Sequence, residues 1–430
     1  MAGASADICH KVTLHQKLCT VRDVLQATSH DMLTHPLRTA RICGVRASEK
    51  LGVRLCQLGP DSIPVAPPAP SFAEVGGPPT VARITTLIDG SEGFDALFRT
   101  IASASSRIDL MIFGWDDDET GRAVASALIE RARAGVSVRL LVDRGGFVLG
   151  QGNAEAVRGS RSFLHALRAE PRILVIEAPN SLARFDHRKA LIVDDQIAWS
   201  GGMILVDGER NFWHDLAFLV EGPIVAQYAN LFEERWTDLG GESSPRFPTA
   251  YDPRIDYNSV VRMVRTDDNH RCLKDSLYGA IDAARSRIIL ENPYFSDPIL
   301  VDKLLAARAR GVDVRAVVTV EGNMPGQNVL SARSANRLLA GGVSVYLYPG
   351  MTHVKAMTVD GIWSYIGTGN FDELSLRNNR EVGLTVQGDG FASILEARLF
   401  LPDQARSRPM RQPLAMPTGW RLVELLELWH

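Results

Sequence analysis

Two stretches of this 430-residue chain decide its fold: HRKALIVD at residues 187–194 and HVKAMTVD at residues 353–360. A shift of 166 positions superimposes them, and the alignment continues without a gap to residues 222 and 388. It keeps a histidine, a lysine, an aspartate, a glycine turn and a later carboxylate in phase. Self-similarity at a fixed shift is typical of duplicated structural units. The sequence therefore predicts two copies of one active-site half.

Each copy is predicted to begin with a β-hairpin. Residues 189–193 and 196–199 have strand-like patterns on either side of Asp194-Asp195, and Asp360-Gly361 occupies the same place in the second copy. A histidine and a lysine one residue apart on a strand point to the same face, so both are expected to reach one pocket. The hairpins end in Gly201-Gly202 and in the run 367–370, where the backbone can approach a ligand closely.

The flanking sequence predicts α/β units. Helical periodicity over residues 120–134 ends at Gly135 between strands at 107–113 and 136–142, and the same order recurs as strand 285–290, helix 298–310, Gly311 and strand 312–320. A strand, a helix and a strand in so few residues form a βαβ unit with parallel strands. Further helices are expected at 91–105 and 328–340, and further strands at 172–176 and 343–348.

Composition narrows the function classes. An apolar fraction of 45%, a charged fraction of 23% and a net charge of -3 are ordinary for a globular protein, and they provide no basic field for a dedicated nucleic-acid binder. No apolar run approaches the length of a membrane span, and the N-terminus lacks the apolar core of a secretory signal. A cytoplasmic location is expected, with any membrane contact peripheral, on the inner face of a membrane.

Residues 1–80 are predicted to be a poorly ordered extension that ends in a Pro-rich linker. The extension holds four histidines, which fit solvated side chains better than a metal site. It also holds four of the five cysteines, and no metal-type spacing occurs. Free thiols in a reducing compartment are expected, and an N-terminal disulfide stays an alternative.

Two imidazoles, two ammonium groups and two carboxylates brought face to face suit displacement at a phosphodiester without a metal. One neutral histidine can attack phosphorus while the other protonates the leaving alcohol. An unperturbed pKa near 6.5 would let one ring be neutral and the other charged. The lysines would neutralise the phosphate oxygens. Zinc is a weaker reading, because lysine is not a usual ligand and no H-E-x-x-H pattern occurs.

The duplicated H-x-K-x4-D motif with its glycine turn resembles the signature of the phospholipase D superfamily, within it the cardiolipin synthases. The resemblance covers about residues 85–400, including HRKALIVDDQIAWSGGM, ENPYFSDPILVDKLLAARARGVDVRAVV and IGTGNFDELSLRNNREVGL. It implies an α/β fold of two phospholipase D-like domains related by a pseudo-twofold axis, each an α-β-α sandwich around a mostly parallel mixed sheet. The expected bounds are 81–255 and 256–402, followed by a tail, 403–430, with an amphipathic helix over 420–429.

The resemblance also implies roles. His187 would be the nucleophile that forms a phosphohistidine, and His353 the general acid. The other expected site residues are the phosphate-binding Lys189 and Lys355, the histidine-orienting Asp215 and Glu381, the substrate-binding Asn370, Gly201, Gly202, Gly367 and Thr368, and the structural motif carboxylates Asp194 and Asp360. Two departures make the halves unequal. Ile204 replaces the family's turn asparagine, and Gly202 and Thr368 stand where serine is common.

Phosphatidyl transfer of the cardiolipin synthase type is the function expected, with no cofactor. The partners would be a phospholipid such as phosphatidylglycerol, an alcohol acceptor and a membrane surface. No nucleic acid is expected, and no oligomer is required, because one chain carries both half-sites. Hydrolysis by a phospholipase D, a nuclease of the same superfamily and a non-catalytic lipid-binding module remain alternatives. The first shares every catalytic residue, the second would want a basic groove with stacking aromatics, and the third is expected to have lost a histidine or lysine.

Overall fold

The computed structural model describes residues 74–146, 163–179, 184–247 and 251–420. The predicted N-terminal extension, most of its Pro-rich linker and nearly all of the predicted C-terminal helix lie outside these residues. The expected domain boundaries stay predictions.

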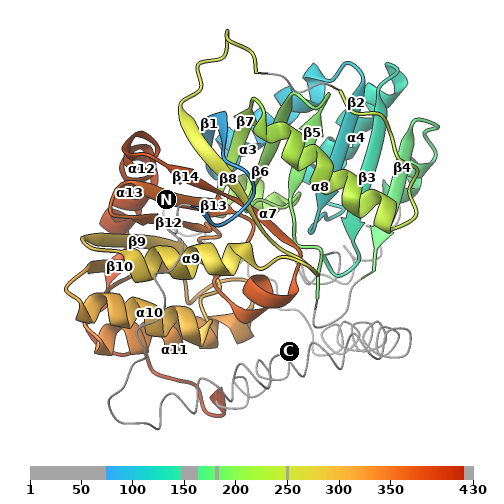
Figure 1. Cartoon of the computed structure of the whole chain (residues 1–430). Helices are drawn as coiled ribbons and strands as arrows, with labels where there is room; N and C mark the ends of the chain where they lie inside the picture. Colours follow the sequence, from blue (N-terminus) through green and yellow to red (C-terminus); the bar gives the residue numbers. More distant parts are fainter. Residues whose placement is uncertain (1–73, 147–162, 180–183, 248–250, 421–430) are drawn as a thin grey trace, which may run out of the picture.

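The first half fills the upper right of Figure 1 and contains the first H-x-K motif. Its helices and strands are β1 (Thr80–Ile88), α3 (Asp89–Ser103), β2 (Arg107–Ile112), α4 (Glu119–Arg133), β3 (Ser137–Asp143), β4 (Ile173–Ala178), β5 (Ala190–Val193), β6 (Ile197–Gly201), α7 (Asp207–Asn211), β7 (Leu216–Glu221) and α8 (Ile224–Asp238).

The second half lies at the lower left and repeats this order. Its elements are β8 (Ser259–Thr266), α9 (Cys272–Ala283), β9 (Arg287–Asn292), α10 (Pro298–Ala309), β10 (Asp313–Val318), α11 (Pro325–Ala340), β11 (Ser344–Leu347), β12 (Ala356–Val359), β13 (Trp363–Gly367), the π-helix η2 (Leu374–Asn378), β14 (Glu381–Gln387), α12 (Asp389–Leu395), η3 (Glu396–Phe400), α13 (Leu401–Arg406) and β15 (Arg408–Pro409).

One sheet runs through both halves, in the order β15-β11-β10-β9-β12-β13-β14-β8-β1-β7-β6-β5-β2-β3-β4. The predicted parallel units are confirmed in β2-β3-β4 and in β9-β10-β11. The mixed α/β fold is also confirmed, but the expectation of mostly parallel strands is wrong. Each hairpin and its neighbours add antiparallel pairs, from β2-β5 through β1-β8 to β12-β9.

Local signals in the sequence set the helix ends. Asp118 caps α4 by accepting a hydrogen bond from Gly121, and Asp297 caps α10 in the same way, with Pro298 at the first helical position. Gly135 and Gly311 follow these helices with φ values of 101° and 92°. A left-handed residue of this kind ends a helix, so both predicted helix stops are confirmed.

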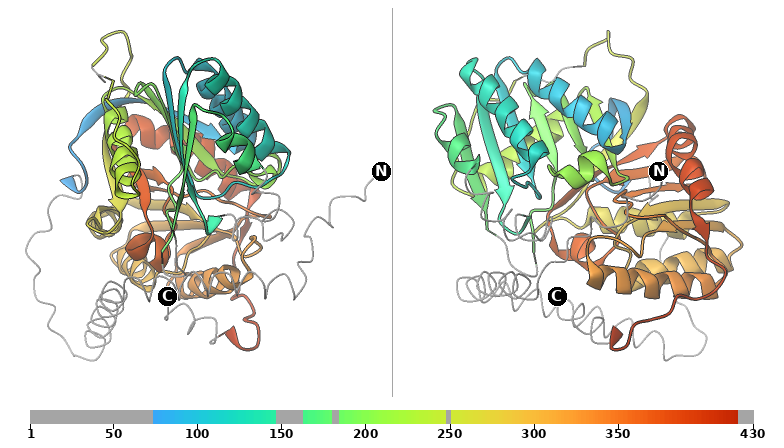
Figure 2. Two further views of the ribbon diagram at one scale, coloured as in Figure 1. Left: turned by 90° about the vertical axis from the view of Figure 1, so that its right-hand side faces the viewer. Right: turned by 180° about the vertical axis from the view of Figure 1, so that it is seen from behind.

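Alternation along the central strands creates layers of helix on both sides of the sheet. In β2, Ile108 and Leu110 pack in the same cluster as α3 and α4, whereas Met111 packs on the other face with α8. Figure 1 shows α8 in front of these strands, and the view from behind in Figure 2 shows α3 and α4 in front instead.

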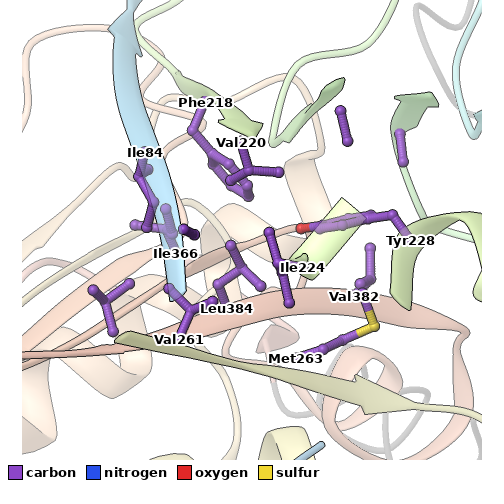
Figure 3. Close-up of a cluster of buried hydrophobic side chains, with 14 of the residues drawn as sticks. Ile84, Phe218, Val220, Ile224, Tyr228, Val261, Met263, Ile366, Val382 and Leu384 are labelled. Carbon is purple, nitrogen blue, oxygen red and sulfur yellow. The ribbon is translucent and has the colours of Figure 1, made fainter. Parts of the chain in front are cut away.

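A core shared by the two halves holds them together. It combines α8 with side chains from the sheet faces of both halves, for example Phe218 and Val220 of β7 with Val382 and Leu384 of β14 (Figure 3). These side chains are fully buried. Burial of apolar surface is the dominant favourable contribution to association, so this core fixes the two H-x-K motifs relative to each other. Among the described residues, no helix is both long and apolar enough to cross a membrane.

Candidate active site

The two motifs cross at the interface of the halves. The backbone N–H of His187 donates to the carbonyl of Arg380 at 2.9 Å, and that of His353 donates to the carbonyl of His214 at 2.6 Å. Arg380 and His214 directly precede Glu381 and Asp215 in the sequence. Each histidine therefore lies beside the carboxylate of the opposite half.

The side chains repeat this exchange. Nδ1 of His187 lies 2.9 and 3.0 Å from the two carboxylate oxygens of Glu381, and Nδ1 of His353 lies 2.9 Å from Oδ2 of Asp215. A carboxylate on Nδ1 fixes the tautomer of the ring and leaves Nε2 for a substrate. The sequence identified both acids, but it did not tell which histidine each would hold.

Both histidines line one pocket at the interface. Its walls are largely aromatic and apolar, and they come from both halves. The lining residues are Phe113, Phe185, His187, Ile204, Trp213, Tyr294, Asn323, Met324, Gln327, His353, Asn370, Asp372, Leu374 and Asn379. Oδ1 of Asn370 is buried and has no hydrogen-bond partner within the described part of the chain, so its acceptor is available to a ligand. Ile204, its counterpart in the repeat, puts an apolar side chain on the same pocket.

The side chains of the two lysines are fully buried. Each donates from Nζ to the backbone carbonyl of its own histidine, Lys189 at 2.7 Å and Lys355 at 2.5 Å. Burial lowers the pKa of Lys189 to about 7 and that of Lys355 to about 8. An anionic phosphate in the pocket would favour the charged form of both groups.

The histidines depart from one expectation. Burial, with Lys355 adding to its effect at the second ring, lowers the pKa of His187 to about 4 and that of His353 to about 3. The prediction that one ring would be charged at neutral pH in the free protein is therefore wrong. A neutral ring suits a nucleophile, whereas the acid role needs a proton from a neighbouring group.

The turn residues support the carboxylates instead of facing the pocket. The Thr368 hydroxyl donates to Oε2 of Glu381 at 2.5 Å and accepts from the N–H of Val382. At Gly202 a Cβ would overlap the carboxylate of Asp215, so only glycine leaves room for it. Gly201 and Gly367 press against the backbone of the next strand. Of the five residues predicted to bind substrate, only Asn370 lines the pocket.

The motif carboxylates anchor loops. Asp194 accepts from the backbone N–H groups of residues 105–107, and Asp360 does the same for residues 285–287. In both hairpins the turn aspartate has positive φ, 51° at Asp194 and 54° at Asp360. Each carboxylate joins its hairpin to the start of the neighbouring strand, β2 or β9, and neither lines the pocket.

Sequence reasoning missed Glu209. It is fully buried on α7, and its Oε1 lies 2.6 Å from Nδ1 of His353. The shift of 166 pairs it with Ser375, so the comparison of repeats that found the other acids gave no signal for this one.

In the described part of the chain, two buried groups bring histidine and carboxylate atoms close enough together to hold a metal ion. One is Glu209, Asp215 and His353, and the other is His214, Glu291 and Asp403. In the first, Nδ1 of His353 is already occupied by carboxylates. In the second, burial alone would lower the pKa of His214, but Asp403 and Asp89 raise it to about 10. A protonated ring does not ligate a metal, so a charge network describes this group better.

The model of the family described as "Cardiolipin synthase, PLD-like domain" matches residues 97–236 and 277–399. The chain belongs to this family. The matched segments contain both H-x-K motifs, the carboxylates beside the two histidines and every residue that lines the pocket. The prediction of a phospholipase D-superfamily enzyme of the cardiolipin synthase type is confirmed.

Individual relatives agree with the family. Cardiolipin synthase A of Pseudomonas aeruginosa (strain LESB58) is 30% identical over 368 residues, which cover 80% of this chain and 74% of the relative. Cardiolipin synthase A of Edwardsiella ictaluri (strain 93-146) is 29% identical over 338 residues, covering 73% and 67%.

Solved structures show the same fold at low identity. The phosphatidylserine synthase of Haemophilus influenzae Rd KW20 superimposes with a TM-score of 0.64 and 14% identity, over 83% of this chain and 96% of its own. The polyphosphate kinase of Porphyromonas gingivalis gives a TM-score of 0.51 and 13% identity, over 81% and 54%. These likenesses concern fold, which many activities share.

Proposed function

We propose that this protein transfers a phosphatidyl group from a phospholipid such as phosphatidylglycerol to an alcohol acceptor, in the manner of a cardiolipin synthase. One observation carries the proposal: histidines from the two repeats line a single pocket, each with its Nδ1 on a carboxylate of the opposite half. The relatives are cardiolipin synthases A, and this activity supplies the substrate class.

The reaction would proceed in two displacements at phosphorus. Nε2 of His187 attacks, the bond to the head-group oxygen breaks, and His353 protonates that oxygen. The acceptor alcohol then loses its proton to His353 and displaces His187 from the phosphohistidine. Because both steps use the same groups, the enzyme returns to its starting state after each transfer.

Lys189 and Lys355 would provide the positive charge for the phosphate, because each is buried and its Nζ donates to the backbone carbonyl of its own histidine. Charges that are already in place in a water-poor site stabilise a transition state without reorganisation. Asn370 would add a polar contact to the substrate. The apolar lining elsewhere, with Phe113, Trp213 and Met324, suits a substrate that carries lipid.

Product analysis tests the assignment. The purified protein is incubated with phosphatidylglycerol vesicles alone, and then with glycerol or ethanol added, and lipids are read by mass spectrometry. Cardiolipin from phosphatidylglycerol alone, and phosphatidylethanol in the presence of ethanol, are expected. Phosphatidic acid as the sole product in both conditions would make the protein a hydrolase. Turnover of single-stranded DNA with no lipid product would make it a nuclease.

A further inference from the structure

The environments of the two histidines are unequal in one respect. Nδ1 of His353 faces two carboxylates, Oε1 of Glu209 at 2.6 Å and Oδ2 of Asp215 at 2.9 Å. Nδ1 of His187 faces the oxygens of Glu381 alone. Two ionised carboxylates this close to one ring nitrogen repel each other, so the group beside His353 is held most favourably when one of the two acids carries a proton.

The surrounding residues strengthen this difference. Glu381 accepts a hydrogen bond from the Thr368 hydroxyl and a longer one from Asn379, so it acts as an acceptor throughout. In the first half, Gly202 stands at the position equivalent to Thr368, and Trp213 stands at the position equivalent to Asn379. Neither oxygen of Glu209 has a hydrogen-bond donor besides the His353 ring among the described residues. Within the described residues, Glu209 thus lacks the hydroxyl and amide donors that hold Glu381 as an acceptor.

The charges facing Glu209 come from several elements: His353, Asp215, Lys355, Lys189 and Tyr294. Burial, with a contribution from Asp215, raises the pKa of Glu209 to about 7, although His353 opposes the shift. Burial also raises the pKa of Asp215 to about 6. A proton is therefore available in this group near neutral pH.

We propose that Glu209 is a positioning residue that stores the proton which His353 passes to the leaving alcohol, so that the His353 half works as the acid and the His187 half as the nucleophile. This inference rests on the proposed function and deepens it. With Glu209 donating to Nδ1, the His353 ring carries its proton on Nε2. With Glu381 accepting from Nδ1, the His187 ring keeps a lone pair on Nε2.

The proton balance closes over the two displacements. As the head-group oxygen leaves phosphorus, it takes the proton from Nε2 of His353, and Nδ1 takes the proton from Oε1 of Glu209, which becomes a carboxylate. The ring is then a base. When the acceptor attacks, its hydroxyl proton goes to Nε2 and the Nδ1 proton returns to Glu209.

The test compares two leaving groups on the same short-chain phosphatidyl group, glycerol and p-nitrophenol. Release of the leaving group is measured in the first turnover, so that only the first displacement counts. Glycerol needs a proton to leave, whereas p-nitrophenolate does not. For Glu209→Gln we expect a loss of about 100-fold or more with the glycerol ester and of no more than about threefold with the nitrophenyl ester. Ser375→Ala, at the repeat-equivalent position, is the control and should leave the ratio of the two rates unchanged.

A second measurement uses the unmodified protein and so does not depend on the variant folding. The ratio of the glycerol rate to the nitrophenol rate should fall as the pH rises through about 7, where Glu209 loses its proton. Titration of the lysines affects both substrates alike and cancels in the ratio.

The outcomes separate the two proposals. Equal losses with both leaving groups in Glu209→Gln, or a ratio independent of pH, would overturn the role of Glu209 and leave phosphatidyl transfer standing. Absence of turnover of either ester by the unmodified protein would overturn the proposed function, and the role of Glu209 with it.

Discussion

Replacing Glu381 by glutamine should prevent His187 from attacking phosphorus, because the replacement changes which ring nitrogen carries the proton. Thr368 accepts from the N–H of Val382, so its hydroxyl hydrogen is committed to the Oε2 position of residue 381. The glutamine oxygen will take that position, and its NH2 group will take the other, 2.9 Å from Nδ1 of His187. Nδ1 must then accept, the ring proton moves to Nε2, and the lone pair that attacks phosphorus is lost.

The size of the effect follows from comparable histidine–carboxylate pairs, where the amide replacement lowers the rate by about 10,000-fold. For this variant we expect a loss of about 1,000- to 10,000-fold, or about 4 to 5.5 kcal/mol of transition-state stabilisation. The assay is the first-turnover release of p-nitrophenol, since this leaving group needs no acid. The melting temperature should change little, because the side chain keeps its shape.

A rescue variant makes the test specific. Adding Thr368→Val removes the hydroxyl that orients the glutamine, which can then turn its oxygen toward His187. The double variant should recover about tenfold over Glu381→Gln alone, the worth of about one hydrogen bond. Glu381→Gln with more than a tenth of the original rate, or a double variant no faster than the single one, would refute the reasoning.

Three further predictions concern the two histidines, the two lysines and the C-terminal tail. His187→Ala and His353→Ala should each lower turnover of phosphatidylglycerol by roughly 10,000-fold, and the double variant should be little slower, because the two rings act as a unit. Substantial turnover in either single variant, or loss of wild-type turnover on adding EDTA, would contradict the mechanism. Because burial lowers the pKa of Lys189 to about 7 and that of Lys355 to about 8, both lose their charge as the pH rises, and kcat/KM should decline between pH 7 and 8; a flat profile through that range would contradict it. If the predicted tail helix docks on lipid, deletion of residues 418–430 should leave turnover of short-chain substrate intact and abolish co-sedimentation with vesicles. If that helix packs in the core instead, the deletion should lower the melting temperature and leave vesicle binding unchanged.

Much of the fold could be predicted because the repeat and the βαβ units are local patterns. Asp194-Asp195 and Asp360-Gly361 specify their hairpins within a few residues, and Gly135 and Gly311 end their helices. The antiparallel strands outside the two hairpins were missed. These strands, such as Leu216–Glu221, are largely buried on both faces and show little alternation, so periodicity gives them a weak signal.

The sequence could predict only part of the site, for a different reason. A gap-free repeat identifies which residue types recur, and it found His187, Lys189 and Asp215 with their counterparts. The repeat carries no information on which carboxylate contacts which histidine, because that depends on how the two halves pack. It is also blind to any group present in one copy only, and Glu209 is such a group. The pKa values of the histidines depend on burial, which sequence spacing does not report.

The exchange of carboxylates between halves bears on how this enzyme could have evolved. Two identical subunits related by a twofold axis would make the same crossed contacts, His187 to one acid and its copy to the other. In such a pair every substitution appears on both sides, so one ring cannot be changed without the other. Joining the copies in one chain removes that constraint. Gly202 against Thr368, and Glu209 against Ser375, are differences that two identical subunits cannot carry. With them, one of two equivalent histidines can be assigned to attack and the other to donate.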